Sequence, residues 1–283
     1  MNKLPIAKKA AVLKALTEGA SIRAASRMTG VSKTTILKLL VEVGEFCAIY
    51  QDHALRNLPC RKVQADEIWA FVGAKARNAR TPGFGDIWTF VAIDADTKLV
   101  VSWLVGHRIG EHAETFMRDV QSRLAHRVQL TTDGHNMYLL AVENAFGWNE
   151  VDFAQLVKQY GPAPEGERRY SPPICLGTIK TRITGEPAEQ DVFTSFVERA
   201  NLSLRMQNRR FTRLTNGFSR KVENHAHALA LHFMVANFCR AHMTLTKARG
   251  GIHTSPVMAA GLTDHVWTLE EMLGLMSGAA MMR

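Results

Sequence analysis

The chain has 283 residues and a formal net charge of +9, with 46% apolar and 22% charged residues. This composition is that of a globular protein and excludes wholesale disorder. No apolar run approaches the roughly 20 residues that span a bilayer, and lysines interrupt the apolar positions near the N-terminus, so neither a membrane span nor a signal peptide is predicted. The four cysteines lie far apart without zinc-ligand spacing, which indicates reduced thiols and a cytoplasmic protein.

Basic side chains are concentrated in two segments of the sequence. Residues 1–62 carry eleven basic and four acidic side chains, whereas residues 199–221 carry seven basic side chains and no acidic one. The rest of the chain is net acidic. Two such blocks indicate two separate nucleic-acid contacts. Solvated helix faces are the simpler alternative, which the lack of interleaved acids disfavours.

Residues 1–58 are interpreted as a small all-α helix-turn-helix module that binds DNA. Apolar spacing predicts a helix over residues 6–18, a short helix that ends at Gly30, and a third helix capped by Ser32. An ordinary helical hairpin is the alternative, but the charge of this region favours DNA. The start of the third helix presents side chains that can contact phosphates or base edges in a major groove, namely Ser32, Lys33, Thr34, Thr35 and Lys38.

The following residues, 59–245, are interpreted as one α/β catalytic domain. Periodicities of two and 3.6 residues predict strands at 63–73, 86–93, 98–106, 128–133 and 151–160, and helices at 111–126 and 138–146. This order is that of a ribonuclease-H-like mixed sheet flanked by helices. Residues 161–187 hold five of the nine prolines and four glycines, so they are predicted to be an irregular insertion. Residues 246–283 are assigned to a C-terminal tail.

Three carboxylates on three different elements are the candidate catalytic and metal-binding residues. Asp66 lies in the middle of an apolar strand, where a carboxylate without a partner costs several kcal/mol to desolvate. Asp133 ends a strand just before a glycine, and Glu198 lies at the edge of the apolar face of a helix over residues 190–210. Such acids suit a pair of Mg²⁺ ions, for which Mn²⁺ could substitute. Arg205, two helical turns after Glu198, could hold a phosphate.

Each acid also has a structural interpretation. Asp66 could bond a backbone amide, Asp133 could cap a turn, and Glu198 could pair with a neighbouring arginine. The competing acids are Glu67, Asp86, Asp94 and Asp96, of which the last two are expected to be solvated in a turn. Three histidines are interpreted as structural, because the first two point about 200° apart on a helix; they are His225, His227 and His232.

The segments QADEIW and TTDGH and the long block from Phe196 to His242 resemble the DDE transposases of bacterial insertion sequences, most closely the insertion-sequence-one family. The resemblance extends from the helix-turn-helix region to Ser255–Gly261. It implies a metal-binding D-D-E triad and a basic residue that touches DNA, which are Asp66, Asp133, Glu198 and Arg205 in this chain. Further backbone contacts are expected from the same basic block, at Arg209, Arg210 and Arg213.

The resemblance implies a Mg²⁺-dependent transposase of the bacterial cytoplasm, associated with the nucleoid. Such an enzyme recognises terminal inverted repeats in double-stranded DNA, nicks a strand to free a 3′-OH, and directs that hydroxyl to target DNA. Because two ends must meet, we expect a homo-oligomer on DNA. Members of the family often begin with a cysteine zinc finger, which this sequence lacks. A catalytically silent DNA-binding regulator and a ribonuclease-H-like nuclease without strand transfer are the alternatives.

Overall fold

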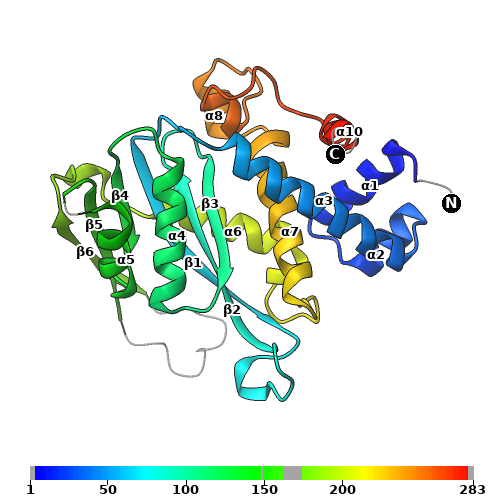
Figure 1. Ribbon diagram of the computed structural model, residues 1–283, viewed down its shortest axis with the longest axis horizontal. Coiled ribbons are helices and arrows are strands. Elements are labelled where there is room, and N and C mark those ends of the chain that lie inside the picture. Colours follow the sequence, from blue (N-terminus) through cyan, green and yellow to red (C-terminus); the bar gives the residue numbers. More distant parts are fainter. Residues whose placement is uncertain (1–3, 148, 162–173, 280–283) are drawn as a thin grey trace.

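A six-stranded mixed sheet with helices on both faces forms the centre of the protein, and three N-terminal helices lie to one side of it (Figure 1). The computed structural model describes residues 4–147, 149–161 and 174–279. No helix within these ranges has both the length and the apolar character that a membrane crossing requires. The strands are β1 (Lys62–Val72), β2 (Gly85–Asp94), β3 (Val100–Gly106), β4 (Gln129–Asp133), β5 (Asp152–Tyr160) and β6 (Cys175–Thr184). The helices are α1 (Ile6–Thr17), α2 (Ile22–Thr29), α3 (Lys33–Ala54), α4 (Gly110–Arg123), α5 (Met137–Phe146), α6 (Ser195–Gln207), α7 (Val222–Met234), α8 (Met243–Ala248), α9 (Pro256–Ala259) and α10 (Leu269–Ala279).

Serine caps mark the starts of α2 and α3, and a glycine marks the end of α2. The hydroxyl of Ser21 accepts a hydrogen bond from the Ala24 amide at 3.1 Å and so caps α2. Gly30 follows α2 with a φ of +69°, a left-handed conformation that glycine adopts without a Cβ clash. The hydroxyl of Ser32 then accepts from the Thr35 amide at 3.2 Å and caps α3. The predicted succession of helix, tight turn and helix is therefore present.

Helix α3 continues for 22 residues and packs along α7, which begins 168 positions after the end of α3. At Gly44 the two helices approach so closely that a Cβ atom would collide with His227. The side-chain amide of Gln51 donates to the carbonyl oxygen of Ala230 at 3.1 Å. One continuous cluster of buried apolar side chains extends from Leu13 in α1 to Leu130 in β4. The N-terminal helices therefore share their hydrophobic core with the sheet.

The strand order is β3-β2-β1-β4-β5-β6. Strands β1, β2 and β3 form an antiparallel meander, β4 and β5 run parallel to β1, and β6 is antiparallel to β5. Along β2, Phe90 and Ala92 pack toward α4, whereas Val91 and Ile93 pack toward α6 and α7. This alternation buries both faces of the sheet. The predicted meander, fourth strand and fifth strand are confirmed.

Two local predictions are wrong. Residues 175–184 are not irregular, because β6 pairs with β5 at the edge of the sheet; the preceding residues 162–173 lie outside the described residues. The side chains of β6 are mostly exposed, so its sequence lacks the apolar alternation of a half-buried strand. Asp94 is not solvated but only 2% exposed, because its carboxylate turns inward and accepts from the Thr97 amide at 3.0 Å. Asp96 in the same turn is exposed, as predicted.

Candidate active site

The pairing of β1 with β4 places two of the predicted acids next to each other. The parallel ladder ends at Ala65 and Thr132, and the following residues on the two strands are Asp66 and Asp133. The side chain of Glu198, from α6, lines the same cavity of about 520 Å³. We call this cavity the acidic cleft. The three acids, which are separated by up to 132 positions in the sequence, therefore converge on one cleft.

Asp66 lies in an environment that opposes its negative charge. Burial, together with the neighbouring carboxylates of Glu67 and Asp133, raises the pKa of Asp66 to about 7. The side-chain amide of Asn201 donates to Asp66 Oδ2 at 3.0 Å and partly offsets that rise. Asn201 lies on the same helical stripe as Glu198, three residues later, so its proximity to the site follows from the spacing of α6. Crowded, half-buried carboxylates of this kind favour a cation among them.

Glu67 is a component of the site that the sequence indicated only as a competing acid. Its side chain is 1% exposed and forms an ion pair with Arg108. The hydroxyl of Tyr138 donates to its second carboxylate oxygen at 2.8 Å. Arg108 also lies 3.8 Å from Asp133 Oδ2 and stacks over the ring of Trp88. Burial raises the pKa of Glu67 as well, and these donors counteract the rise. No local pattern in the sequence predicts these contacts, because Arg108 follows β3 and Tyr138 lies in α5, both far from Glu67 in the sequence.

The chemistry of the donors fits a divalent metal ion. One carboxylate oxygen from each of Asp66, Glu67 and Asp133 lies within 4.8 Å of the others. Carboxylate oxygens are the ligands that Mg²⁺ and Mn²⁺ prefer. Glu198 is not a member of this cluster: Lys158 Nζ lies 2.5 Å from its Oε2, and the hydroxyl of Thr194 donates to its Oε1. The partner of Glu198 is therefore a lysine from β5 rather than an arginine of its own helix.

The predicted DNA-contacting residues of α3 lie on the protein surface. Ser32, Lys33, Thr34, Thr35 and Lys38 are all exposed, and the hydroxyls of Ser32 and Thr35 lie 2.8 Å apart.

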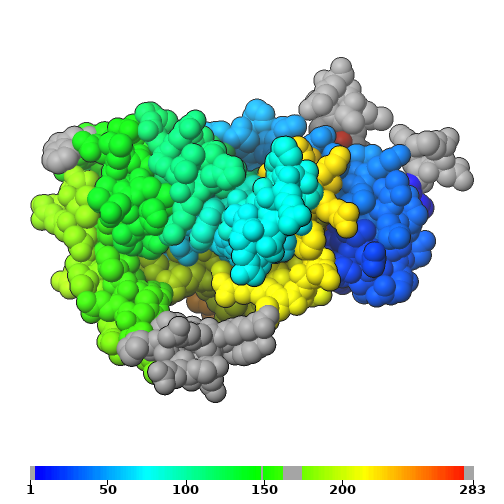
Figure 2. All heavy atoms as spheres, turned by 90° about the horizontal axis from the view of Figure 1, so that it is seen from below, coloured from blue at the N-terminus to red at the C-terminus, as the bar shows by residue number. Residues whose placement is uncertain are grey.

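The basic residues after α6 are buried to different extents. Arg213 is exposed, whereas Arg205, Arg209 and Arg210 are partly buried. The two basic segments are not separate surfaces, because the packing of α3 on α7 brings the start of α3 beside residues 209–224. Figure 2 shows the N-terminal helices in blue against this segment in yellow. The expectation of two separate contacts is therefore wrong: the basic segments adjoin.

Two of the three histidines of α7, His225 and His232, are buried in the fold. His225 is fully buried and His232 is 4% exposed. Burial lowers the pKa of each to about 3, and the charges of Arg210 and Arg240 respectively lower it further. Both rings are therefore neutral at physiological pH. His225 Nδ1 lies 3.1 Å from the hydroxyl of Ser219, which fixes the orientation of its ring.

Comparisons with known proteins return transposases among the solved structures. No protein-family model matches the sequence, and no curated protein matches it. A piggyBac transposase synaptic complex with hairpin DNA is similar over 98% of this chain and 72% of that chain, with 11% identity and a TM-score of 0.43. A Mos1 transposase paired-end complex with the left transposon end is similar over 54% of this chain and 60% of that chain, with 15% identity and a TM-score of 0.23. The Mos1 strand transfer complex is similar over 83% of this chain and 79% of that chain, with 12% identity and a TM-score of 0.25.

Proposed function

We propose that the protein is a metal-dependent DNA transposase of the insertion-sequence type. The observation that carries this proposal is the convergence of Asp66, Asp133 and Glu198 on one cleft. The sheet order supports a ribonuclease-H-like catalytic fold, since a meander of three strands is followed by two strands parallel to the first. The proposed organisation is a helix-turn-helix module at residues 1–58, a catalytic domain at 59–245 and a tail at 246–283.

Asp66, Asp133 and Glu198 are proposed to hold two Mg²⁺ ions, with Glu67 as a further oxygen donor beside the first two. Bound metal ions would activate the attacking oxygen and stabilise the leaving oxygen of a phosphodiester. The chain's other residues would position these ligands: Asn201 orients Asp66, whereas Arg108 holds Glu67 and also lies near Asp133. Phosphoryl transfer depends on positioning and charge neutralisation, so no covalent nucleophile from the protein is required.

Basic residues near the cleft are proposed to hold double-stranded DNA. Burial and the charge of Arg213 lower the pKa of Arg205, whereas the carboxylate of Asp66 raises it, so Arg205 lies between the basic segment and the acidic cleft. Arg209 and Arg210 continue the basic surface toward the exposed residues 32–35 and 38 at the start of α3. Because strand transfer joins two ends to a target, the active form is proposed to be a homo-oligomer on DNA. The proposed location is the bacterial cytoplasm, at the nucleoid.

Substitution of Asp66 by Asn tests this function, because it removes one metal-ligand charge while keeping the shape of the side chain. Purified Asp66→Asn is expected to lose Mg²⁺-dependent nicking of duplex DNA that carries the element ends. Its binding to that DNA in a gel shift should persist. Asp96→Asn, at an exposed turn, is the matched control and should nick normally. Nicking by Asp66→Asn at the unsubstituted rate would remove Asp66 from the active site.

A further inference from the structure

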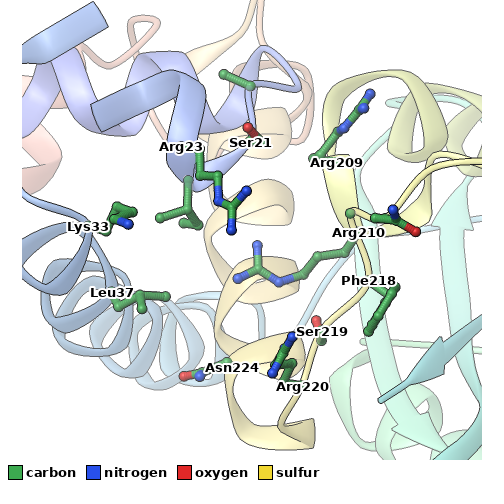
Figure 3. Close-up of a pocket in the computed structure, with 14 residues that line it drawn as sticks. Ser21, Arg23, Lys33, Leu37, Arg209, Arg210, Phe218, Ser219, Arg220 and Asn224 are labelled. Atoms are coloured by element: carbon green, nitrogen blue, oxygen red, sulfur yellow. The ribbon is translucent and has the colours of Figure 1, made fainter. Parts of the chain in front are cut away.

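A second cavity, distinct from the acidic cleft, lies between the N-terminal helices and the segment that follows α6 (Figure 3). Its volume is about 780 Å³. One wall comes from the starts of α2 and α3, and the other comes from residues 209–224. We call it the basic cavity, because its charged lining residues are Arg23, Lys33, Arg209, Arg210 and Arg220.

Among the residues that the structure describes, the cationic groups of this cavity lack protein counter-ions. Within residues 4–147, 149–161 and 174–279, none of the five basic side chains forms an ion pair, and no carboxylate lines the cavity. Arg210 Nε is shielded from solvent and has no hydrogen-bond partner in the described part of the chain. Burial lowers the pKa of Arg210 to about 10, which still leaves the guanidinium charged at neutral pH. A partly buried guanidinium whose shielded Nε–H has no acceptor is unfavourable, so the cavity is complementary to an anion.

The shape of the lining favours a phosphate group as that anion. Figure 3 shows the guanidinium groups of Arg23 and Arg210 directed into the same space from opposite walls. A guanidinium presents paired N–H donors that match the oxygens of a phosphate. Ser21 and Asn224 add uncharged polar groups, whereas Leu37 and Phe218 give the cavity apolar surface beside them. This mixture suits a phosphodiester with its attached sugar better than a bare inorganic ion.

The position of the cavity connects it with the rest of the basic surface. Arg209 and Arg210 line it, and the same segment continues to Arg213, whose charge acts on Arg205. The carboxylate of Asp66 in the acidic cleft raises the pKa of Arg205, against the larger lowering by burial and by Arg213. Arg205, Arg209, Arg210 and Arg213 thus place four positive charges in one short segment that reaches the basic cavity.

We propose that the basic cavity binds one backbone phosphate of a nucleic-acid strand, held jointly by Arg23 and Arg210. The identity of the strand as transposon DNA rests on the proposed function above. One phosphate bound by arginines of both walls connects the N-terminal helices with the segment after α6. It thereby fixes the path of the strand between α3 and the acidic cleft. Arg23 is a new assignment, and Arg210 becomes one half of a clamp rather than an independent surface contact.

A double-mutant cycle tests whether the two arginines hold the same phosphate. We would measure duplex binding by fluorescence anisotropy at several salt concentrations for Arg23→Gln, Arg210→Gln and the double variant. Each single variant should bind the duplex about tenfold more weakly. The steepness with which the logarithm of the binding constant falls with the logarithm of the salt concentration should decrease by about one. The loss in the double variant should be clearly smaller than the product of the two single losses. Losses that multiply, or single variants that bind like the unsubstituted protein, would overturn the shared clamp.

Thermal unfolding with pyrophosphate as the probe separates this site from a folding defect. Pyrophosphate should raise the melting temperature of the unsubstituted protein but not that of Arg210→Gln. Arg210→Gln without anions should be at least as stable as the unsubstituted protein, because it removes an unpaired charge. Arg118→Gln, an exposed arginine paired with Glu114, is the matched control and should keep the full pyrophosphate response. Equal protection of Arg210→Gln would refute the site.

Competition distinguishes a backbone phosphate from a free anion. A short duplex should displace pyrophosphate from the cavity. The rise in melting temperature with both ligands present should therefore be smaller than the sum of the two separate rises. Independent, additive protection by pyrophosphate and duplex would show a site for a free anion and overturn the backbone assignment. Asp66→Asn should retain the pyrophosphate response. If Asp66→Asn nicked DNA normally, that result would count against the proposed function. The pyrophosphate response that tests the cavity would be unaffected.

Discussion

Lys158 Nζ lies 2.5 Å from Glu198 Oε2, so an ammonium group from β5 already neutralises the carboxylate that we propose as the third metal ligand. Both side chains are partly exposed, at 30% for the lysine and 38% for the glutamate. The proposed metal ions and Lys158 therefore compete for the same negative charge. Solvent screening keeps the energy of such a pair small.

Replacement of Lys158 by Gln should strengthen metal binding. Removal of the competing ammonium is expected to tighten Mn²⁺ binding by up to about fivefold, as a partly exposed ion pair contributes about 1 kcal/mol at most. Isothermal calorimetry with the metal-free protein would measure the change. Lys180→Gln is the control, because the ammonium of Lys180 donates to a backbone carbonyl oxygen, that of Glu189, at 2.6 Å. Unchanged or weaker Mn²⁺ binding in Lys158→Gln would contradict the role of Glu198 as a ligand.

The raised pKa of Asp66 predicts how metal-free stability depends on pH. The folded protein keeps the proton of Asp66 up to about pH 7, whereas the unfolded chain releases it near its ordinary pKa of 3.8. The stabilising contribution of this group is therefore complete below about pH 4 and is lost as the pH rises to 7. Between pH 5 and pH 8, the urea midpoint in chelator should fall more for the unsubstituted protein than for Asp66→Asn. Parallel falls would contradict the environment described for Asp66.

Metal binding should show the opposite dependence on pH. Because a cation displaces the proton of Asp66, Mn²⁺ affinity should rise as the pH increases through 7 and then level off. Calorimetry at pH 6, 7 and 8 would follow this change and the protons released. Affinity that does not change over this range would show that Asp66 is already ionised in the metal-free protein.

Tyr138 is expected to stabilise the fold through its hydrogen bond to Glu67. Tyr138→Phe keeps the buried ring but removes the donor to a carboxylate that has few other partners. The free energy of unfolding should fall by about 1.5–3 kcal/mol, the usual value for a hydrogen bond to a charged group. Chemical denaturation would measure it, with Tyr160→Phe at an exposed position as the control. A loss no larger than that of the control would mean that water replaces the hydroxyl.

Lys38 provides a test of the proposed DNA-binding face of α3, because it is exposed and does not line the basic cavity. Lys38→Gln should weaken duplex binding several-fold and lower the salt slope by about one. Lys14→Gln, on the exposed side of α1, removes the same charge and should have little effect. Equal effects of the two substitutions would indicate dependence on net charge alone and count against this face of α3.

The order of the secondary structure elements follows from local patterns in the sequence. Ser32 as a helix cap and the alternation along β2 each depend on near neighbours, and both are confirmed. Strand β6 was not predicted, because its side chains are mostly exposed and show no apolar alternation. It is recognised as a strand only through its pairing with β5. Asp94 lies in a turn whose sequence predicts solvent exposure. Its carboxylate is nevertheless buried, because the amide of Thr97 in the same turn donates a hydrogen bond to it.

Prediction of the site was limited by contacts between distant segments. The positions of the three acids relative to their own strands and helix were predictable, and their common cleft follows from the predicted sheet. The ion pair of Glu67 with Arg108 was not predictable, because it depends on where β3 ends relative to β1. The adjoining basic segments likewise depend on the packing of α3 on α7, which no local pattern indicates.

The most direct test of the account is a strand-joining assay with purified protein, labelled duplex bearing the element ends, target DNA, and Mg²⁺ or Mn²⁺. The unsubstituted protein should produce joined end-target molecules. Asp66→Asn, Asp133→Asn and Glu198→Gln should bind the ends but yield neither nicked nor joined DNA. Joining by any of these three variants at the unsubstituted rate, or cleavage by the unsubstituted protein that never leads to joined products, would contradict a strand-transferring triad.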